Sequence, residues 1–210
     1  MRTKLILTTA AFGLASFGAF AQVYSVNAVG YINVTVPAKS FALVANQLNT
    51  GGNTVAEVLT GVAEGTVVFK YAQAGGFAAN SFEFGEWATP TAKIQPGEGF
   101  FLQNNGAAAA TFTFVGEVPQ GTALTTALAN GLNLVSSQVP QAGKLVADLK
   151  FPATEGDVVY QWDTAAQKYK AANGFEFGEW GSGEPTIAVG EGFFVQKNGA
   201  GSWVRSFSVN

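Results

Sequence analysis

Apolar and polar residues alternate along most of this chain, a pattern typical of short, half-buried β-strands. Near the N-terminus, Ile32, Val34 and Val36 occupy alternate positions in an extended stretch from residue 23 to residue 36. The phase of this alternation changes near Gly30, which predicts a bulge or a bend between two strand segments. Similar apolar runs follow at intervals of about 8 to 12 residues, a spacing that favours an antiparallel sandwich or a small, partly open barrel.

Two stretches of the sequence occur twice. Phe82–Trp87 and Phe175–Trp180 both read FEFGEW, and GEGFFLQNNGA from Gly97 is matched by GEGFFVQKNGA from Gly190. Both matches hold an offset of 93 positions. A fixed offset of this size indicates an internal duplication of one structural unit.

A short helix is predicted in each copy. In the first copy, Asn53 is a suitable N-cap and Gly61 is a suitable terminator. Val146 and Leu149 occupy the matching apolar positions of the second copy. The fold predicted from these patterns is all-β, with two tandem duplicated antiparallel β-sandwich or small-barrel modules, each with one short helix.

Turn signals separate the predicted strands. Pro96-Gly97 is suited to a type II turn, in which glycine takes the position of positive φ. Asn105-Gly106 and Asn198-Gly199 are the strongest hairpin signals, because both residue types accept the positive φ of a type I′ turn. The connection between the copies is short, so we expect modules of residues 22–117 and 118–210 that pack side by side.

The aromatic residues of FEFGEW have two interpretations. Phe82 and Phe84 share one face of the predicted strand, and a bulge at Gly85 would return Trp87 to that face, so that three aromatic rings enter one core. Alternatively, the aromatic residues form a flat surface platform on which sugar rings stack: Trp87, Trp162, Trp180 and Trp203, with Tyr71 and Tyr169.

Residues 1–21 have the features of a secretory signal peptide. A basic start precedes an apolar stretch from Leu5 to Phe17, and Ala19-Phe20-Ala21 fits the small-x-small cleavage pattern. The expected mature chain begins at Gln22 and is secreted, to the extracellular space or the cell surface. No later stretch approaches the ~20 apolar residues that a membrane-spanning helix requires, so we expect no membrane span after cleavage.

The composition narrows the function. Charged residues make up 12% of the chain, against about 25% in an average soluble domain. Histidine and cysteine are absent, which removes the commonest general base, the commonest metal ligand and all thiol chemistry. Basic residues are not clustered, which argues against nucleic acid as a partner. A surface so poor in charge favours association with copies of itself or with a polymer such as polysaccharide.

The duplicated carboxylates are the remaining candidates for chemistry. Paired carboxylates are what glycoside hydrolysis requires, but a glutamate in a Gly-Glu-Gly turn more often accepts backbone hydrogen bonds. We therefore predict no enzymatic activity, no catalytic residue, no cofactor and no metal. A weak alternative is a calcium site around Glu155, Asp157 and Asp163. The predicted ligand patch, for the case of carbohydrate binding, consists of Glu86, Trp87, Glu98, Glu179, Trp180 and Glu191.

The chain resembles a family of secreted bacterial tandem β-module proteins to which no activity is assigned. The resemblance rests on the opening VYSVNAVGYINVTVP, on the FALVANQLN and LNLVSSQV stretches and on the GEGFF turn, and it covers both predicted modules. It implies an exported β-protein with a surface or matrix role, and it brings no catalytic residues.

The leading hypothesis is a secreted, non-enzymatic structural protein that self-assembles into a filament, surface layer or matrix. The alternative is an extracellular carbohydrate-binding protein. Assembly by strand donation is one route, because the segment from Gln22 becomes free only after cleavage and alternates like a strand. Tyr24, Val26 and Ala28 would then insert into a neighbouring subunit. The other interpretation is an ordinary first strand that pairs within its own module.

Overall fold

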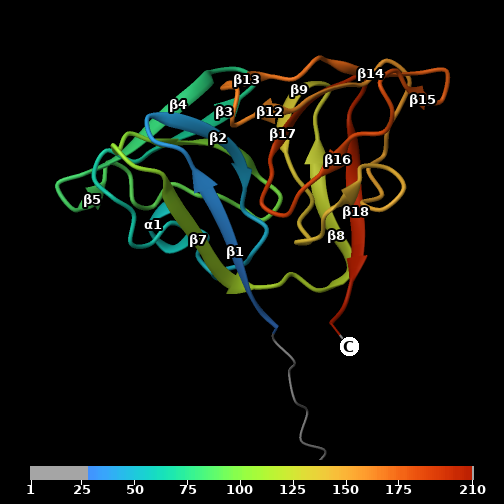
Figure 1. Ribbon diagram of the computed structural model, residues 1–210. Helices are drawn as coiled ribbons and strands as arrows, with labels where there is room; N and C mark the ends of the chain where they lie inside the picture. Colours follow the sequence, from blue (N-terminus) through green and yellow to red (C-terminus); the bar gives the residue numbers. More distant parts are fainter. Residues whose placement is uncertain (1–27, 210) are drawn as a thin grey trace, which may run out of the picture.

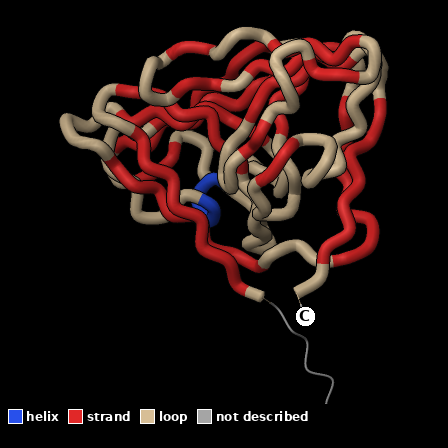
Figure 2. Tube along the Cα trace, turned by 45° about the vertical axis from the view of Figure 1, so that its right-hand side comes forward, coloured by secondary structure: helices blue, strands red, loops and turns tan. Residues whose placement is uncertain are grey.

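A computed structural model describes residues 28–209, and within them the chain is almost entirely β-structure (Figure 1). The strands are β1 (Val29–Val36), β2 (Ser40–Ala45), β3 (Val67–Ala72), β4 (Gly76–Glu83), β5 (Glu86–Trp87), β6 (Gly99–Asn104), β7 (Ala110–Glu117), β8 (Gly121–Leu128), β9 (Gly131–Val135), β10 (Gly143–Lys144), β11 (Val158–Tyr160), β12 (Trp162–Asp163), β13 (Lys168–Tyr169), β14 (Asn173–Glu176), β15 (Glu179–Trp180), β16 (Thr186–Ile187), β17 (Phe193–Lys197) and β18 (Gly201–Phe207). The single helix of this range is α1 (Val55–Val58), the short blue segment in Figure 2. Over residues 28–209, no helix has the length and apolar character needed to span a membrane.

Two open, five-stranded antiparallel sheets form the framework, one in the N-terminal half (residues 28–117) and one in the C-terminal half (residues 121–209). The first sheet has the order β2-β6-β3-β4-β5, and the second has the order β9-β17-β11-β14-β15. The two orders correspond strand for strand, because FEFGEW lies in β4–β5 and in β14–β15, and GEGFF leads into β6 and into β17. Strands β2, β5, β9 and β15 are the edges, so neither sheet closes on itself.

A two-stranded ribbon accompanies each sheet. In the N-terminal half β1 pairs with β7, and in the C-terminal half β8 pairs with β18 (Figures 1 and 2). Inward-facing residues of each ribbon and its sheet enclose a hydrophobic core. In the N-terminal half, Ile32 and Phe114 from the ribbon join Val68 and Phe100 from the sheet. In the C-terminal half, the equivalent core includes Trp203 and Phe193.

The two halves pack against each other through a third apolar cluster. Its buried members are Leu43 and Phe101 from the N-terminal half and Leu134 and Phe194 from the C-terminal half. Backbone hydrogen bonds add to this contact: Ala45 N donates to Gly190 O at 2.9 Å, and Ser136 N donates to Gly97 O at 2.9 Å. The halves therefore lie side by side, in agreement with the short connection.

The Gly30 and helix predictions need correction. β1 pairs with β7 without a register change from Val29 to Val36, so the described part has no bulge at Gly30. The predicted bend stays untested, because residues 23–27 of its first segment lie outside the described residues. In the N-terminal half Thr54 caps the helix, one residue later than the predicted cap Asn53. The Thr54 hydroxyl and Glu57 form a capping box. The C-terminal half has only turns at residues 145–149. Its residue in the place of Thr54 is Lys144, which pairs with Thr186 as Thr54 pairs with Lys93 and has no side-chain oxygen to cap a helix.

The hairpin predictions for Asn105-Gly106 and Asn198-Gly199 are wrong. Strands β6 and β7 belong to different sheets, as do β17 and β18, so each Asn-Gly pair lies in a crossover instead of a two-residue hairpin. The Pro96-Gly97 turn is as predicted: Gly97 has φ 86°, and Glu98 N donates to Gln95 O at 2.9 Å.

Candidate interaction surfaces

The FEFGEW stretches form tight hairpins at opposite ends of the molecule (Figure 1). Glu83 pairs with Glu86 across the first hairpin, which leaves Phe84 and Gly85 as the two turn residues. Their φ values are 56° and 82°. Positive φ at both central positions defines a type I′ turn, whose backbone twist matches that of the strands. Phe177 and Gly178 repeat this geometry, with φ 54° and 78°.

A single carboxylate holds each turn. Phe84 N and Gly85 N donate to the two carboxylate oxygens of Glu64, at 2.8 and 2.7 Å. In the second hairpin, Phe177 N and Gly178 N donate to the two carboxylate oxygens of Glu155, again at 2.8 and 2.7 Å. Sequence reasoning missed this role for both glutamates. The available signal was the Glu-Gly pair that recurs at residues 64 and 155 ahead of each FEFGEW.

The phenylalanine of each turn projects into solvent. Phe84 is 94% exposed and Phe177 is 95% exposed, which corrects the prediction that Phe82, Phe84 and Trp87 enter one core. The predicted bulge at Gly85 is instead the second residue of the type I′ turn. Phe82 does pack against the core, and its ring lies 5.4 Å from that of Trp87.

The two tryptophans of the predicted ligand patch lie in the hydrophobic cores. Trp87 is 4% exposed and Trp180 is 9% exposed, so neither indole offers a face on which a sugar could stack. The indole Nε1 of Trp180 is buried and has no hydrogen-bond partner among the described residues. The core interpretation of these residues agrees with the structure.

The four glutamates of the predicted patch fall into two groups. Glu86 and Glu179 are exposed beside the hairpin turns. Glu98 and Glu191 lie instead in turns at the junction of the halves, where Gln95 N and Ala188 N donate to them at 2.9 and 2.8 Å. The patch residues of each repeat are therefore not brought together, and the turn interpretation holds for the Gly-Glu-Gly motifs.

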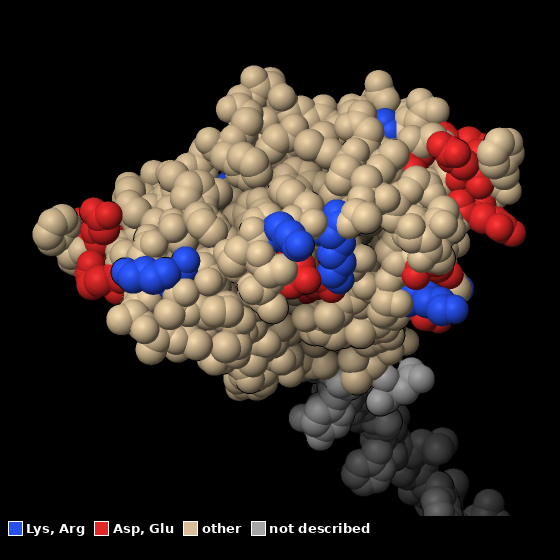
Figure 3. Space-filling model, turned by 45° about the horizontal axis from the view of Figure 1, so that its top comes forward, with Lys and Arg blue, Asp and Glu red and all other residues tan. Residues whose placement is uncertain are grey.

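Acidic side chains gather at the two ends of the molecule that carry β5 and β15 (Figure 3). Each end has three exposed glutamates: one accepts hydrogen bonds from the two turn amides, and the other two flank the turn in the sequence. These residues are Glu64, Glu83 and Glu86 at one end, and Glu155, Glu176 and Glu179 at the other. We call each FEFGEW hairpin with these glutamates a hairpin tip.

An aromatic hollow of about 440 Å³ opens at the junction of the two halves. Its lining residues come from six strands and both halves: Phe41, Phe69, Phe77, Phe101, Trp162 and Tyr169. Phe101 is buried, whereas Phe77 and Tyr169 are 49% and 42% exposed and form the rim. Burial raises the pKa of the Tyr169 phenol above its ordinary value of 10.0. An almost purely apolar hollow of this kind suits an apolar or aromatic group.

Contacts between the halves hold the hollow in shape. The amide of Gln167 acts like one residue of a strand: Phe41 N donates to its Oε1 and its Nε2 donates to Phe41 O, both at 2.8 Å. Trp162 Nε1 donates to the same carbonyl at 3.2 Å. These bonds cover the edge of β2, which would otherwise offer free backbone groups to another chain.

A polar cleft of about 520 Å³ lies on another side of the junction. Amide side chains dominate its lining, among them Asn49, Asn53, Gln95 and Gln138. Asn53 Nδ2 donates to Asn49 Oδ1 at 2.9 Å and approaches Gln95 Oε1 at 3.3 Å. Amides both donate and accept hydrogen bonds, so this cleft suits a ligand rich in hydroxyl groups.

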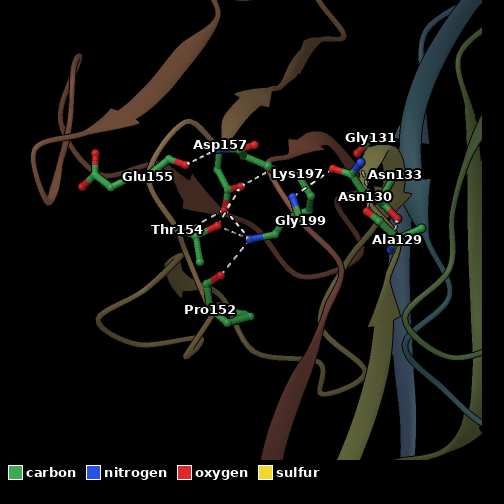
Figure 4. Close-up of polar contacts among 11 residues, drawn as sticks. Ala129, Asn130, Gly131, Asn133, Pro152, Thr154, Glu155, Asp157, Lys197 and Gly199 are labelled. Carbon is green, nitrogen blue, oxygen red and sulfur yellow. Dashed lines mark hydrogen bonds and ion pairs between the residues drawn. The ribbon is translucent and has the colours of Figure 1, made fainter.

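The candidate calcium residues have other partners. Asp157 is fully buried in an ion pair with Lys197, whose Nζ also donates to Pro152 O and Thr154 Oγ1 at 3.0 Å (Figure 4). Asp163 accepts from the amides of residues 165 and 166, and Glu155 holds a hairpin turn. Within the described residues, no three His, Cys, Asp or Glu side chains are grouped as a metal site.

Comparison of the chain with protein-family models, with curated proteins and with solved structures finds no match.

Proposed function

We propose that this is a secreted, non-enzymatic structural protein that assembles with copies of itself into an extracellular filament, surface layer or matrix. In this proposal the chain consists of two duplicated β-sandwich modules, residues 22–117 and 118–210, after removal of the signal peptide of residues 1–21. The repeated FEFGEW and GEGFF stretches and the matching strand orders of the two sheets support the duplication.

The observation that carries the proposal is the pair of hairpin tips. Each tip presents one almost fully exposed phenylalanine, and the tips lie at opposite ends of the molecule (Figures 1 and 3). A molecule with the same contact group at both ends can bridge two neighbours, and repeated bridging produces a polymer. The low content of charged residues supports this assembly, because few like charges oppose close packing.

The test uses the mature chain of residues 22–210. Sedimentation velocity over a range of protein concentrations should show growing species, and electron microscopy should show ordered polymers. A chain that remains monomeric at every concentration would refute self-assembly. Secretion is tested separately: N-terminal sequencing of the exported protein should find Gln22 as the first residue.

Strand donation by the N-terminal segment stays a prediction. Tyr24 and Val26 lie outside the described residues, whereas the carbonyl of Ala28 accepts from Val118 N of the same chain at 2.7 Å. A chain that begins at Gly30 tests this route. Strand donation requires the shortened chain to stay folded and to lose polymerisation. Normal polymerisation, or a simple loss of folding, would contradict it.

The second candidate function is carbohydrate binding, and the amide-lined cleft favours it. Polysaccharide binding can be measured by affinity electrophoresis, in which a bound polymer retards the protein. Replacing Gln95 by Ala should reduce the retardation if the cleft is the site. Loss of binding in the Glu86→Gln/Glu179→Gln variant instead would place the ligand at the glutamates of the hairpin tips. Binding that neither variant alters would place it at neither surface.

A further inference from the structure

We propose that the hairpin tip of one copy docks into the aromatic hollow of a second copy, with Phe84 or Phe177 as the inserted side chain. This inference rests on the proposed self-assembly and identifies the two surfaces that meet. The partner is a second copy of this chain, because the chain itself presents an exposed phenyl ring at each tip and an apolar hollow lined by aromatic side chains.

Phenylalanine is a costly residue at the position that it occupies in both tips. Type I′ turns favour Asn-Gly, because a side chain larger than that of Asn or Asp seldom adopts positive φ. Phe84 and Phe177 adopt it at 56° and 54°, and both rings are left in water. Four other non-glycine residues also have positive φ, so the feature that points to a contact is the exposure of a phenyl ring at the same place in both tips. A contact that removes the ring from water would explain both features.

Each tip is prepared for docking before any partner arrives. The two hydrogen bonds to Glu64 fix the turn amides, and Phe82 and Trp87 fix the base of the hairpin in the core. A rigid tip loses little conformational entropy on binding, which favours association. The tip with Phe177 has the same construction through Glu155.

The hollow is complementary to such a tip. Its lining consists of six aromatic side chains, and its volume of about 440 Å³ exceeds that of a benzyl group. The hollow has no charged lining residue: Lys170 lines a separate cleft, and Lys39 Nζ donates to Asn105 O. The docking contact therefore rests on burial of the apolar ring.

Neither tip occupies the hollow of its own chain, because the rings of Phe84 and Phe177 are both almost fully exposed. Phe77 lies at the rim of the hollow near the start of β4, and Phe84 follows the end of β4, seven residues further on. At about 3.3 Å per residue, the two side chains are on the order of 23 Å apart. The contact is therefore intermolecular and joins two different surfaces. An arrangement of this kind grows as an open chain where its rotation does not close a ring.

The experiment compares three variants with the wild-type mature chain by sedimentation velocity. Phe84→Ser/Phe177→Ser removes both tips and keeps the hollow. Phe77→Asp blocks the rim of the hollow and keeps both tips. Tyr31→Ser is the control, because Tyr31 is also exposed but lies on β1, away from both surfaces. We expect the first two variants to remain monomeric, with an apparent dissociation constant raised by about 30-fold or more, since truncating a central aromatic residue has effects of this size. The control should assemble like the wild type.

Mixing the two assembly-deficient variants provides the decisive measurement. The tipless variant still has a hollow, and the hollow-blocked variant still has two tips, so together they should form small complexes of two or three chains that grow no further. Such complexes also show that both variants are folded. If Phe77→Asp lowers the melting temperature, Tyr169→Asp takes its place.

The outcomes separate the two proposals. A wild-type chain that never assembles overturns self-assembly and the docking contact with it. Polymers that persist in Phe84→Ser/Phe177→Ser, or a mixture of the two variants that stays monomeric while the wild type assembles, overturn the docking contact and leave self-assembly standing.

Discussion

Replacing Lys197 by Asn is expected to lower the free energy of unfolding by about 3–5 kcal/mol, because it leaves a fully buried carboxylate without its cation. The side chains of Lys197 and Asp157 are 3% and 0% exposed, and they form an ion pair. The ammonium group uses its remaining donors on Pro152 O and Thr154 Oγ1, and it lies 5.4 Å from the centre of the Phe151 ring. Water cannot replace the lost cation at such a site.

The N-terminal half supplies the matched control for this substitution. At the positions that correspond to Asp157 and Lys197 it has Thr66 and Asn104, both buried and neutral. Asn104 Nδ2 bonds to three backbone carbonyls at 2.9 to 3.0 Å, so the same place in the fold can be filled without charge. The double variant Asp157→Thr/Lys197→Asn should therefore cost only about 1–2 kcal/mol, well below the sum of its single substitutions.

The assay is urea denaturation of the wild type, both single variants and the double variant, followed by tryptophan fluorescence. We expect a coupling energy of about 3 kcal/mol or more between the two positions. Additive single-variant effects would refute it, because they would mean that neither charge depends on the other. A cost below about 1 kcal/mol for Lys197→Asn would show that the site behaves like an exposed ion pair.

Four further predictions concern single features of the fold. Glu64→Gln should reduce the stability in urea by about 1–2 kcal/mol, because the hydrogen bonds to the turn amides lose their charged acceptor. Gly192→Ala should cost about 1–3 kcal/mol in the same assay, because the added Cβ would lie 2.5 Å from Val44 O. Gly201→Ala is the control and should be nearly neutral, because a Cβ there meets no atom within 4 Å. Trp180→Ala should cost about 3–5 kcal/mol, and Trp180→Phe clearly less, because the indole Nε1 makes no hydrogen bond; equal costs would contradict this. The backbone hydrogen bond from Thr54 is the main cause of the lowered pKa of Glu57. The ionised Glu57 carboxylate therefore stabilises the fold above its ordinary pKa of 4.5, and this stabilisation is lost as the pH falls through the folded-state pKa. Glu57→Gln should flatten this acid dependence of the melting temperature.

The all-β class and several strands could be predicted from the sequence because strands leave a local pattern. Ile32, Val34 and Val36 alternate with polar residues, and the structure places Ile32 and Val36 in the core. The FEFGEW and GEGFF stretches lie at corresponding places of two sheets with matching strand orders, and the duplication that they suggest stays a proposal. Pattern reasoning failed at Phe84, because aromatic residues at alternate positions usually share one buried face, whereas here the type I′ turn interrupts the strand between them.

The candidate site was harder to predict because it depends on tertiary packing. Asn105-Gly106 is a strong local hairpin signal, yet β6 and β7 pair with different partners, and no local pattern indicates which sheet a strand joins. The aromatic hollow draws its lining from strands of both halves that are far apart in the sequence. The roles of Glu64 and Gln167 depend on turn amides and a strand edge that exist only in the folded chain.

The contact between the two halves has a consequence for how large such a chain can become. One strand end of each half pairs with a turn of the other half: Val44 pairs with Glu191, and Val135 pairs with Glu98. The arrangement resembles the interface of a twofold-symmetric dimer, in which the same patch serves on both sides and the contact is complete after two units. A third module joined to this chain would find both strands and both turns already occupied. This contact therefore limits the chain to a pair, and any further growth must use surfaces away from the pseudo-twofold axis.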